Sequence, residues 1–167
     1  MPNSQTETYR VGQTGEHLVA AELGRRGVVC SILSGNAPEI DILAFRNGKS
    51  IAVQVKAIRS GSMHARADRY LEIKMDGYRQ IVLGKKNDID RSMAFVVVFL
   101  GENAGEDRFY VLTHGDLQDQ IEQNHRVFLA RHHGVRPKNP MSMHTGVSEE
   151  QLSKFIGCWD TILTHLI

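Results

Sequence analysis

Residues 39–59 read EIDILAFRNGKSIAVQVKAIR, two alternating apolar runs on either side of the pair Asn47-Gly48. Alternation with a period of two is typical of β-strands. An Asn-Gly pair between two such runs is the strongest short signal for a hairpin. The sequence therefore predicts strands at 39–46 and 49–59 joined by a tight turn.

Three polar residues interrupt the apolar pattern of this hairpin. Gln54 and Lys56 lie two residues apart and therefore face the same way, at positions where the pattern calls for apolar side chains. Asp41 interrupts the first strand in the same manner. Burying an amide, an ammonium and a carboxylate without partners would cost several kcal/mol each. A shared site, and preferably a shared cation, would remove that cost.

A helix is predicted upstream of the hairpin, over residues 14–26, with Gly27 at its stop position. Glu16 lies on its apolar stripe, three, four and seven residues before Val19, Ala20 and Leu23. It is therefore expected to point inward and to join the other three polar residues.

The remaining elements follow from the same kind of pattern. Residues 94–100 are apolar and valine-rich, as in a central strand covered on both faces. A capping box of Ser148 and Gln151 marks the start of the last helix. The other expectations are, in order, loosely ordered residues 1–10, a strand at 28–33, a turn at 34–38, a loop over 60–92 with short elements at 70–73 and 80–83, a strand at 108–112, a helix at 116–132, a loop at 134–146 and a helix from 148 towards 166.

Composition indicates one ordinary globular domain spanning residues 1–167. The chain has 167 residues, of which 41% are hydrophobic and 23% charged, with a formal net charge of +1. Between residues 56 and 86, however, eight Lys or Arg face only three Asp or Glu, a local excess of five positive charges. Such a block could bind phosphates or could simply be a solvated face.

Cysteines and apolar runs point to the compartment. Cys30 and Cys158 belong to no Cys/His cluster and are expected to be buried free thiols. The longest apolar run, residues 93–100, is too short to cross a bilayer, and the first ten residues do not resemble a signal peptide. We therefore expect a soluble cytoplasmic protein with no membrane partner.

The order of these motifs resembles the PD-(D/E)XK nuclease superfamily. The matching text is GQTGE at 12–16, EIDILA at 39–44 and VQVK at 53–56. The Gln-x-Lys form is similar to Mrr-type restriction endonucleases, and archaeal Holliday-junction resolvases are the other branch it resembles. The motifs cover residues 12–59, and the helical part from about 115 to 167 is merely compatible. The chain departs from the pattern in two ways: Pro38 lies three residues before Asp41, and Gln54 replaces a carboxylate.

The resemblance implies an α/β fold with a restriction-endonuclease-like central mixed sheet, flanked by helices and followed by C-terminal helices. It also implies a metal-dependent DNA endonuclease that hydrolyses phosphodiester bonds with Mg²⁺ or Mn²⁺. The implied catalytic residues are Glu16, Asp41, Gln54 and Lys56. The implied metal ligands are Glu16, Asp41, Gln54 and the Val55 carbonyl. The implied DNA contacts are Lys56, Arg59, Arg66 and Arg69. A homodimer would supply the two sites that cutting both strands requires.

Other interpretations remain open at this point. Taken singly, Glu16 fits a helix-capping residue, Asp41 a turn residue and Lys56 a strand lysine that reaches solvent. Because Gln54 leaves only two formal negative charges, a nuclease-fold protein that binds nucleic acid or a protein partner without cutting is the alternative function. A regulatory subunit with a satisfied polar core is a third. The late histidines, His125, His132, His133 and His144, fit no ligand spacing and are expected on helix surfaces or loops.

Overall fold

The computed structural model describes residues 4–33 and 40–167 of the chain. Its helical elements are α1 (Ser4–Arg25), η1 (Ala67–Arg69), α2 (His114–Arg131), α3 (Glu149–Leu152), η2 (Ser153–Phe155), α4 (Asp160–Leu163) and η3 (Thr164–Leu166). Its strands are β1 (Val29–Ile32), β2 (Ile42–Arg46), β3 (Lys49–Ile58), β4 (Met63–Arg66), β5 (Leu71–Asp76), β6 (Arg79–Lys85), β7 (Ala94–Phe99), β8 (Arg108–Thr113) and β9 (His144–Val147).

The predicted hairpin is confirmed as β2 and β3. Asn47 and Gly48 form its turn with positive φ angles of 54° and 78°, as a tight two-residue turn requires. Arg46 pairs with Lys49 beside the turn, and Ile42 pairs with Val53 at the far end. The predicted turn at 34–38 and residue 39 lie outside the described residues.

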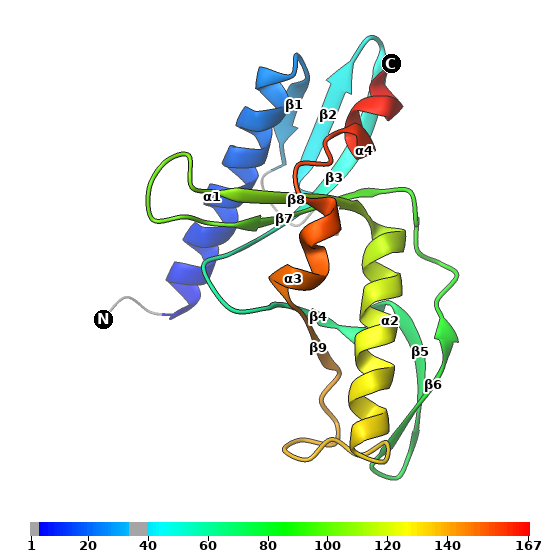
Figure 1. Ribbon diagram of the computed structural model, residues 1–167. Helices are drawn as coiled ribbons and strands as arrows, with labels where there is room; N and C mark the ends of the chain where they lie inside the picture. Colours follow the sequence, from blue (N-terminus) through cyan, green and yellow to red (C-terminus); the bar gives the residue numbers. More distant parts are fainter. Residues whose placement is uncertain (1–3, 34–39) are drawn as a thin grey trace.

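The hairpin is part of a mixed sheet with the order β1-β2-β3-β7-β8. β3 and β7 are parallel, and the other neighbours are antiparallel. β7 is buried along its whole length, as its valine-rich sequence predicts. Helices cover both faces of this sheet (Figure 1). The predicted fold class is therefore confirmed.

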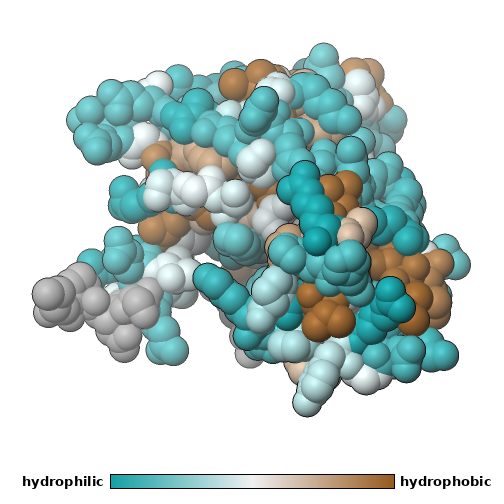
Figure 2. Space-filling view, turned by 60° about the horizontal axis from the view of Figure 1, so that its bottom comes forward, coloured by the Kyte–Doolittle hydropathy of each residue, from teal (hydrophilic) through white to brown (hydrophobic). Residues whose placement is uncertain are grey.

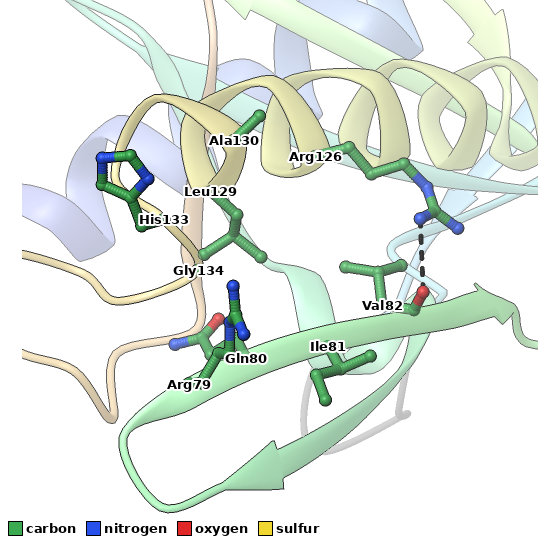
Figure 3. Close-up of a pocket in the computed structure, with 9 residues that line it drawn as sticks. All are labelled: Arg79, Gln80, Ile81, Val82, Arg126, Leu129, Ala130, His133 and Gly134. Atoms are coloured by element: carbon green, nitrogen blue, oxygen red, sulfur yellow. Dashed lines mark hydrogen bonds between the residues drawn. The ribbon is translucent and has the colours of Figure 1, made fainter.

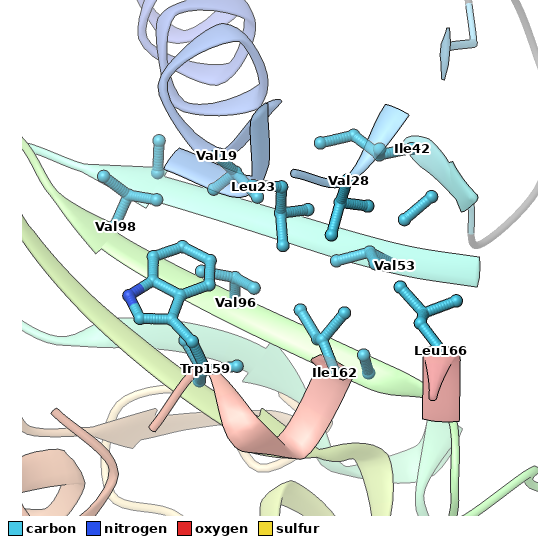
Figure 4. Close-up of a cluster of buried hydrophobic side chains, with 14 of the residues drawn as sticks. Val19, Leu23, Val28, Ile42, Val53, Val96, Val98, Trp159, Ile162 and Leu166 are labelled. Carbon is cyan, nitrogen blue, oxygen red and sulfur yellow. The ribbon is translucent and has the colours of Figure 1, made fainter. Parts of the chain in front are cut away.

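Each face of the sheet has its own apolar core. On one face, Val19 and Leu23 of α1 pack with Trp159, Ile162 and Leu166 from the C-terminal segment (Figure 4). On the other face, buried side chains of β7 and β8 pack against α2 and α3 in a second cluster. β3 contributes to both cores, because its residues alternate between the two faces.

Several predicted boundaries were wrong. Helix α1 begins ten residues earlier than predicted, because its polar first part is exposed and has no apolar stripe to reveal it. Residues 71–85 form an antiparallel hairpin, β5–β6, with a register shift between Glu72 and Ile73, rather than a loop with short elements. β4 and β9 pair although they are far apart in sequence, with Met63 opposite Val147 and Arg66 opposite His144, and both lie almost entirely in segments that were predicted as loops.

The last predicted helix is also interrupted. Its capping box is present, but the helix stops at Leu152 and resumes only at Asp160. Between these elements Ile156 is extended and Gly157 has a φ angle of 63°, a conformation that favours glycine. The two cysteines are free, as predicted, but only half-buried. Within the described residues, no helix is both long and apolar enough to cross a membrane.

Candidate active site

Asp41 is fixed at the entrance to β2. Its backbone N–H donates to the Val53 carbonyl over 3.1 Å, which extends the β2–β3 ladder by one residue. Its carboxylate oxygen Oδ2 accepts a hydrogen bond of 2.7 Å from the Val55 backbone N–H. A carboxylate that accepts a main-chain amide has little rotational freedom, so Asp41 is held against the middle of β3.

Glu16 reaches the same region from α1. A Cβ atom at the preceding residue, Gly15, would overlap the Cβ of Ala57 and come within 3.6 Å of Val55 Cγ1. The missing side chain therefore lets α1 lie close to β3. Burial raises the pKa of the Glu16 carboxyl, and the negative charge of Asp41 raises this pKa further, against an opposing effect of His17. The Glu16 carboxylate on α1 and the Asp41 carboxylate before β2 therefore interact electrostatically.

The remaining candidate residues of β3 lie on its two opposite faces. Val53, Val55 and Ala57 face α1 and belong to or pack against the first core. Gln54, which is half-buried, and Lys56, which is exposed, project from the opposite face.

The Val55 main chain lies between these two faces, and its polar groups point along the plane of the sheet. In a strand, the N–H and C=O of one residue point to the same side. The Val55 carbonyl therefore points, like its amide, towards Asp41 and past the end of β2.

The arrangement brings only part of the predicted set into direct contact. Glu16 interacts electrostatically with Asp41, and Asp41 is hydrogen-bonded to Val55. Within residues 4–33 and 40–167, neither Gln54 nor Lys56 forms a hydrogen bond or ion pair with these carboxylates. The same ranges contain no group of three or more His, Cys, Asp or Glu side chains that could hold a metal ion. Any cation here would therefore need the neutral oxygens of Gln54 and Val55 as well.

The Gln54 side chain lines a cleft of about 610 Å³. The cleft is lined by Gln54, Arg69, Tyr70, Lys86, Asp88, Ile89, Asp90, Met93 and His114. The two cations of this lining, Arg69 and Lys86, come from the locally basic segment. Asp90 is already engaged, since it accepts hydrogen bonds from the Ser92 amide (2.9 Å) and hydroxyl (2.6 Å). These bonds lower the pKa of Asp90.

A buried glutamine that was not predicted from the sequence connects the segments that form the wall of this cleft. Gln118 of α2 is fully buried. It donates to the carbonyls of Tyr70 (2.8 Å) and Lys86 (2.9 Å), and it accepts from the Arg91 guanidinium. The Lys86 amide also donates to the Tyr70 carbonyl over 2.9 Å. The only sequence signal was an amide beside Leu117 on the apolar stripe of α2.

The predicted DNA-contacting residues differ in their surroundings. Lys56 and Arg59 are exposed, and Arg69 lines the cleft. Arg66 lies on β4 and is paired with Asp68, with 3.0 Å between Nε and Oδ1. Arg66 is thus less available to a phosphate than the other three.

A second hollow, of about 590 Å³, lies between β6 and the last turns of α2 (Figure 3). Its lining includes Ile81, Leu129 and Gly134, and no carboxylate. One edge is closed by Arg126, which donates to the Val82 carbonyl over 3.2 Å. This end of the molecule is mostly hydrophilic, with separate apolar patches (Figure 2). An apolar hollow without acids is a poor candidate for phosphodiester chemistry, so the cleft at Gln54 is the stronger one.

His125 corrects the prediction for the late histidines. It is completely buried rather than on a helix surface. Its Nδ1 is 2.6 Å from the Thr145 hydroxyl, and its Nε2 is 2.9 Å from Gln80 Oε1. Gln80 donates its own amide hydrogens to the carbonyls of Pro140 and Ser142. Its oxygen must therefore accept from His125 Nε2–H, which fixes the neutral tautomer of the imidazole.

The mixed five-stranded sheet with helices on both faces defines the molecule as an α/β protein with an endonuclease-like fold. Among solved structures, its fold is similar to that of the bacterial homing endonuclease I-Ssp6803I, with a TM-score of 0.50 and 14% sequence identity. The similarity covers 94% of this chain and 93% of that chain. No family model and no curated protein sequence matches the chain. At this level of identity, the likeness concerns the fold alone.

Proposed function

We propose that this chain is a metal-dependent endonuclease that hydrolyses phosphodiester bonds in DNA. The observation that carries the proposal is the Asp41 carboxylate, bound to the Val55 amide and coupled to Glu16. Gln54, the neighbour of Val55 on β3, lines a cleft together with the cations Arg69 and Lys86. The endonuclease-like fold makes DNA the expected substrate.

The donor set fits a divalent cation that prefers oxygen. Glu16, Asp41, Gln54 and the Val55 carbonyl would hold Mg²⁺ or Mn²⁺, with water completing its coordination. Burial first, and then the charge of Asp41, raises the pKa of Glu16, and a nearby cation would offset both effects on its carboxylate. Such an ion, when bound, makes water a stronger nucleophile and neutralises charge that develops on the phosphate.

The chain's own residues would bind and orient the substrate. Arg69 and Lys86 supply positive charge to the phosphate backbone without reading the sequence. Lys56 projects from the same strand face as Gln54 and is exposed, so its ammonium can approach the scissile phosphate. There it would stabilise the developing oxyanion or orient the nucleophile. The Val55 amide keeps Asp41 oriented throughout.

One specific feature favours the alternative of a nuclease-fold protein that binds nucleic acid or a protein partner without cutting. Gln54 contributes no charge where a third carboxylate would hold a cation more tightly. Two formal negative charges suit one hydrated Mg²⁺ and make a tightly bound pair of metals unfavourable.

A cleavage assay with and without metal separates the two functions. Supercoiled, linear, branched and single-stranded DNA would be incubated with Mg²⁺ or Mn²⁺, and again with EDTA. We expect cutting of at least one substrate that EDTA abolishes. Lys56→Ala should lower the cleavage rate by at least about 100-fold while DNA affinity stays nearly unchanged, because its effect lies in the transition state.

The matched control is Lys74→Ala, which removes an exposed strand lysine that does not line the cleft. It should cut like the wild type. If the wild type cuts none of the four substrates with either metal, the catalytic proposal fails and the binding protein becomes the better account.

A further inference from the structure

A second basic cleft lies between α2 and the ribbon of β4 and β9. Its volume is about 300 Å³. The lining residues are His64, Asn124, Phe128, Arg136, His144, Thr145 and Gly146, none of which is acidic. It shares no lining residue with the cleft at Gln54. Asn124 follows His114 by ten residues on α2, so the two clefts are roughly 15 Å apart along that helix.

Arg136 is the arginine among the lining residues of this cleft. Its guanidinium carbon lies over the Phe128 ring, 4.5 Å from the ring centroid, which is within the range of a cation–π contact. The side chain is half-buried, and burial lowers the pKa of Arg136. In the part of the chain that the structure describes, no carboxylate pairs with it. A partly desolvated positive charge without a counter-charge favours an anion.

Two histidines face the same space from the ribbon. In the β4–β9 pairing His64 lies opposite Gly146, and Arg66 lies opposite His144. Residues opposite each other in a ribbon share one side, and so do residues two apart on one strand. Both imidazoles therefore lie on the same side of the ribbon, together with Arg66. A Cβ atom at Gly146 would lie 3.4 Å from His64 Cε1, so this imidazole lies directly over the glycine. Among the described residues, neither imidazole has a hydrogen-bond partner.

The floor of the cleft is rigid. Asn124 donates to the Gly146 carbonyl over 2.8 Å and to Gln151 Oε1 over 3.0 Å, which ties α2 to β9 and α3. Thr145 is held by its contact with buried His125. A site with fixed walls loses little entropy when it binds a small ion.

We propose that this cleft binds a phosphate group, with Arg136, His64 and His144 as its donors. A planar guanidinium offers parallel N–H donors that match a phosphate oxyanion, and each imidazole adds one more. The group could belong to free phosphate or to a phosphodiester of a nucleic acid. The site does not depend on the proposed cleavage, because no residue of the candidate active site takes part.

The first test uses inorganic phosphate and the full chain. Histidine ring signals would be followed by NMR during a phosphate titration, with sodium chloride of equal ionic strength as the blank. We expect saturable shifts of the His64 and His144 signals. Arg136→Gln should weaken the apparent affinity by at least about tenfold, the effect of losing a charge-assisted hydrogen bond. The control Arg131→Gln removes an exposed arginine outside the cleft and should leave the affinity unchanged.

A thermal melt of each variant checks its fold, and His144→Gln provides a second test if Arg136→Gln does not fold. Identical responses to phosphate and chloride would overturn the proposal, and so would equal affinities for wild type and the cleft variants.

A second arm identifies the source of the phosphate. Binding of a short DNA duplex would be measured by fluorescence anisotropy for wild type and Arg136→Gln. A phosphodiester ligand predicts weaker binding and a smaller salt dependence in the variant. Unchanged DNA binding together with lost phosphate binding assigns the site to free phosphate. Because the phosphate arm needs no cleavage, failure of the nuclease proposal leaves its result standing.

Discussion

A change at Gln54 tests the proposed catalytic function against the proposed non-catalytic one. Gln54 is half-buried, precedes Val55 on β3 and lines the cleft of about 610 Å³ described above. If its oxygen is a ligand, Gln54→Glu adds a charged donor to the two carboxylates. The variant should then gain more thermal stability from Mg²⁺ than the wild type gains, because a tighter ligand stabilises the native state more. Melting curves with Mg²⁺ and with EDTA provide the comparison.

Gln123→Glu serves as the control, since it adds the same charge to an exposed position on α2. It should not change the response to Mg²⁺. If Gln54 is only a core amide, its replacement should destabilise the fold by about 1–3 kcal/mol with and without metal. That outcome would remove Gln54 from the metal site.

A second prediction at the residue scale concerns His125. Burial is the main cause that lowers the pKa of this imidazole, to about 4, and the positive charge of Arg136 lowers it further. In the unfolded chain the same group titrates near 6.5. Between these values only the unfolded state takes up the proton. The free energy of unfolding should therefore fall as the pH drops from about 6.5 to 4, by up to about 1.4 kcal/mol per pH unit.

Urea denaturation at pH 7 and at pH 5 measures this effect. His125→Gln should be less stable than the wild type at pH 7 by about 1–3 kcal/mol, because the bonds to Gln80 and Thr145 are disturbed. It should also lose less stability on acidification. His133→Gln, at an exposed position, should show the wild-type pH dependence. An equal slope in all three proteins would contradict the assignment.

At the scale of elements, the contact between α1 and β3 determines where Glu16 lies. Gly15→Ala places a methyl group where the Cβ of Ala57 already is, so the helix must move away from the strand. Overpacking of this kind costs about 1–3 kcal/mol, against a gain of about 1 kcal/mol in helix propensity. Cleavage should fall by more than the loss of folded protein explains, because Glu16 moves with the helix.

Gly24→Ala is the matched control in the same helix, since a Cβ there meets no atom within 4 Å. It should raise stability by up to about 1 kcal/mol and leave cleavage unchanged. Urea denaturation and the nicking assay on the same preparations give both quantities. Wild-type cleavage by a folded Gly15→Ala protein would show that Glu16 does not need this close contact.

The elements also show how much could be predicted from sequence. The β2–β3 hairpin has two apolar runs of strand-forming residues on either side of Asn47-Gly48, a turn pair typical of tight hairpins, so the local sequence was enough to predict it. The pairing of β4 with β9 depends on residues that are far apart in sequence, and neither strand has a pattern of its own. Some residues of the candidate site could likewise be predicted from the sequence, and others could not. Asp41 and Gln54 stood out as polar residues in apolar runs, whereas the cleft wall depends on Gln118, whose partners come from three separate segments.

For the whole molecule, net charge and charge distribution lead to different expectations. A net charge of +1 provides little attraction for DNA at a distance. Binding should then depend on the few cations that reach phosphates in the ground state, chiefly Arg59, Arg69 and Lys86. Each contact releases counterions, so three contacts predict a slope of about −2.7 for log affinity against log salt concentration. Fluorescence anisotropy of a labelled duplex between low and moderate salt measures this slope.

The double variant Arg69→Gln/Lys86→Gln tests whether the cleft is the source of that slope. Both side chains line the cleft, so their loss should reduce the slope by about two and weaken binding at low salt most strongly. Lys74→Gln removes an exposed lysine outside the cleft and should change neither quantity appreciably. Duplex binding that is independent of salt, or a double variant with the wild-type slope, would place the DNA on another surface. The cations of the Gln54 cleft would then be structural, and the catalytic proposal would lose its substrate-binding component.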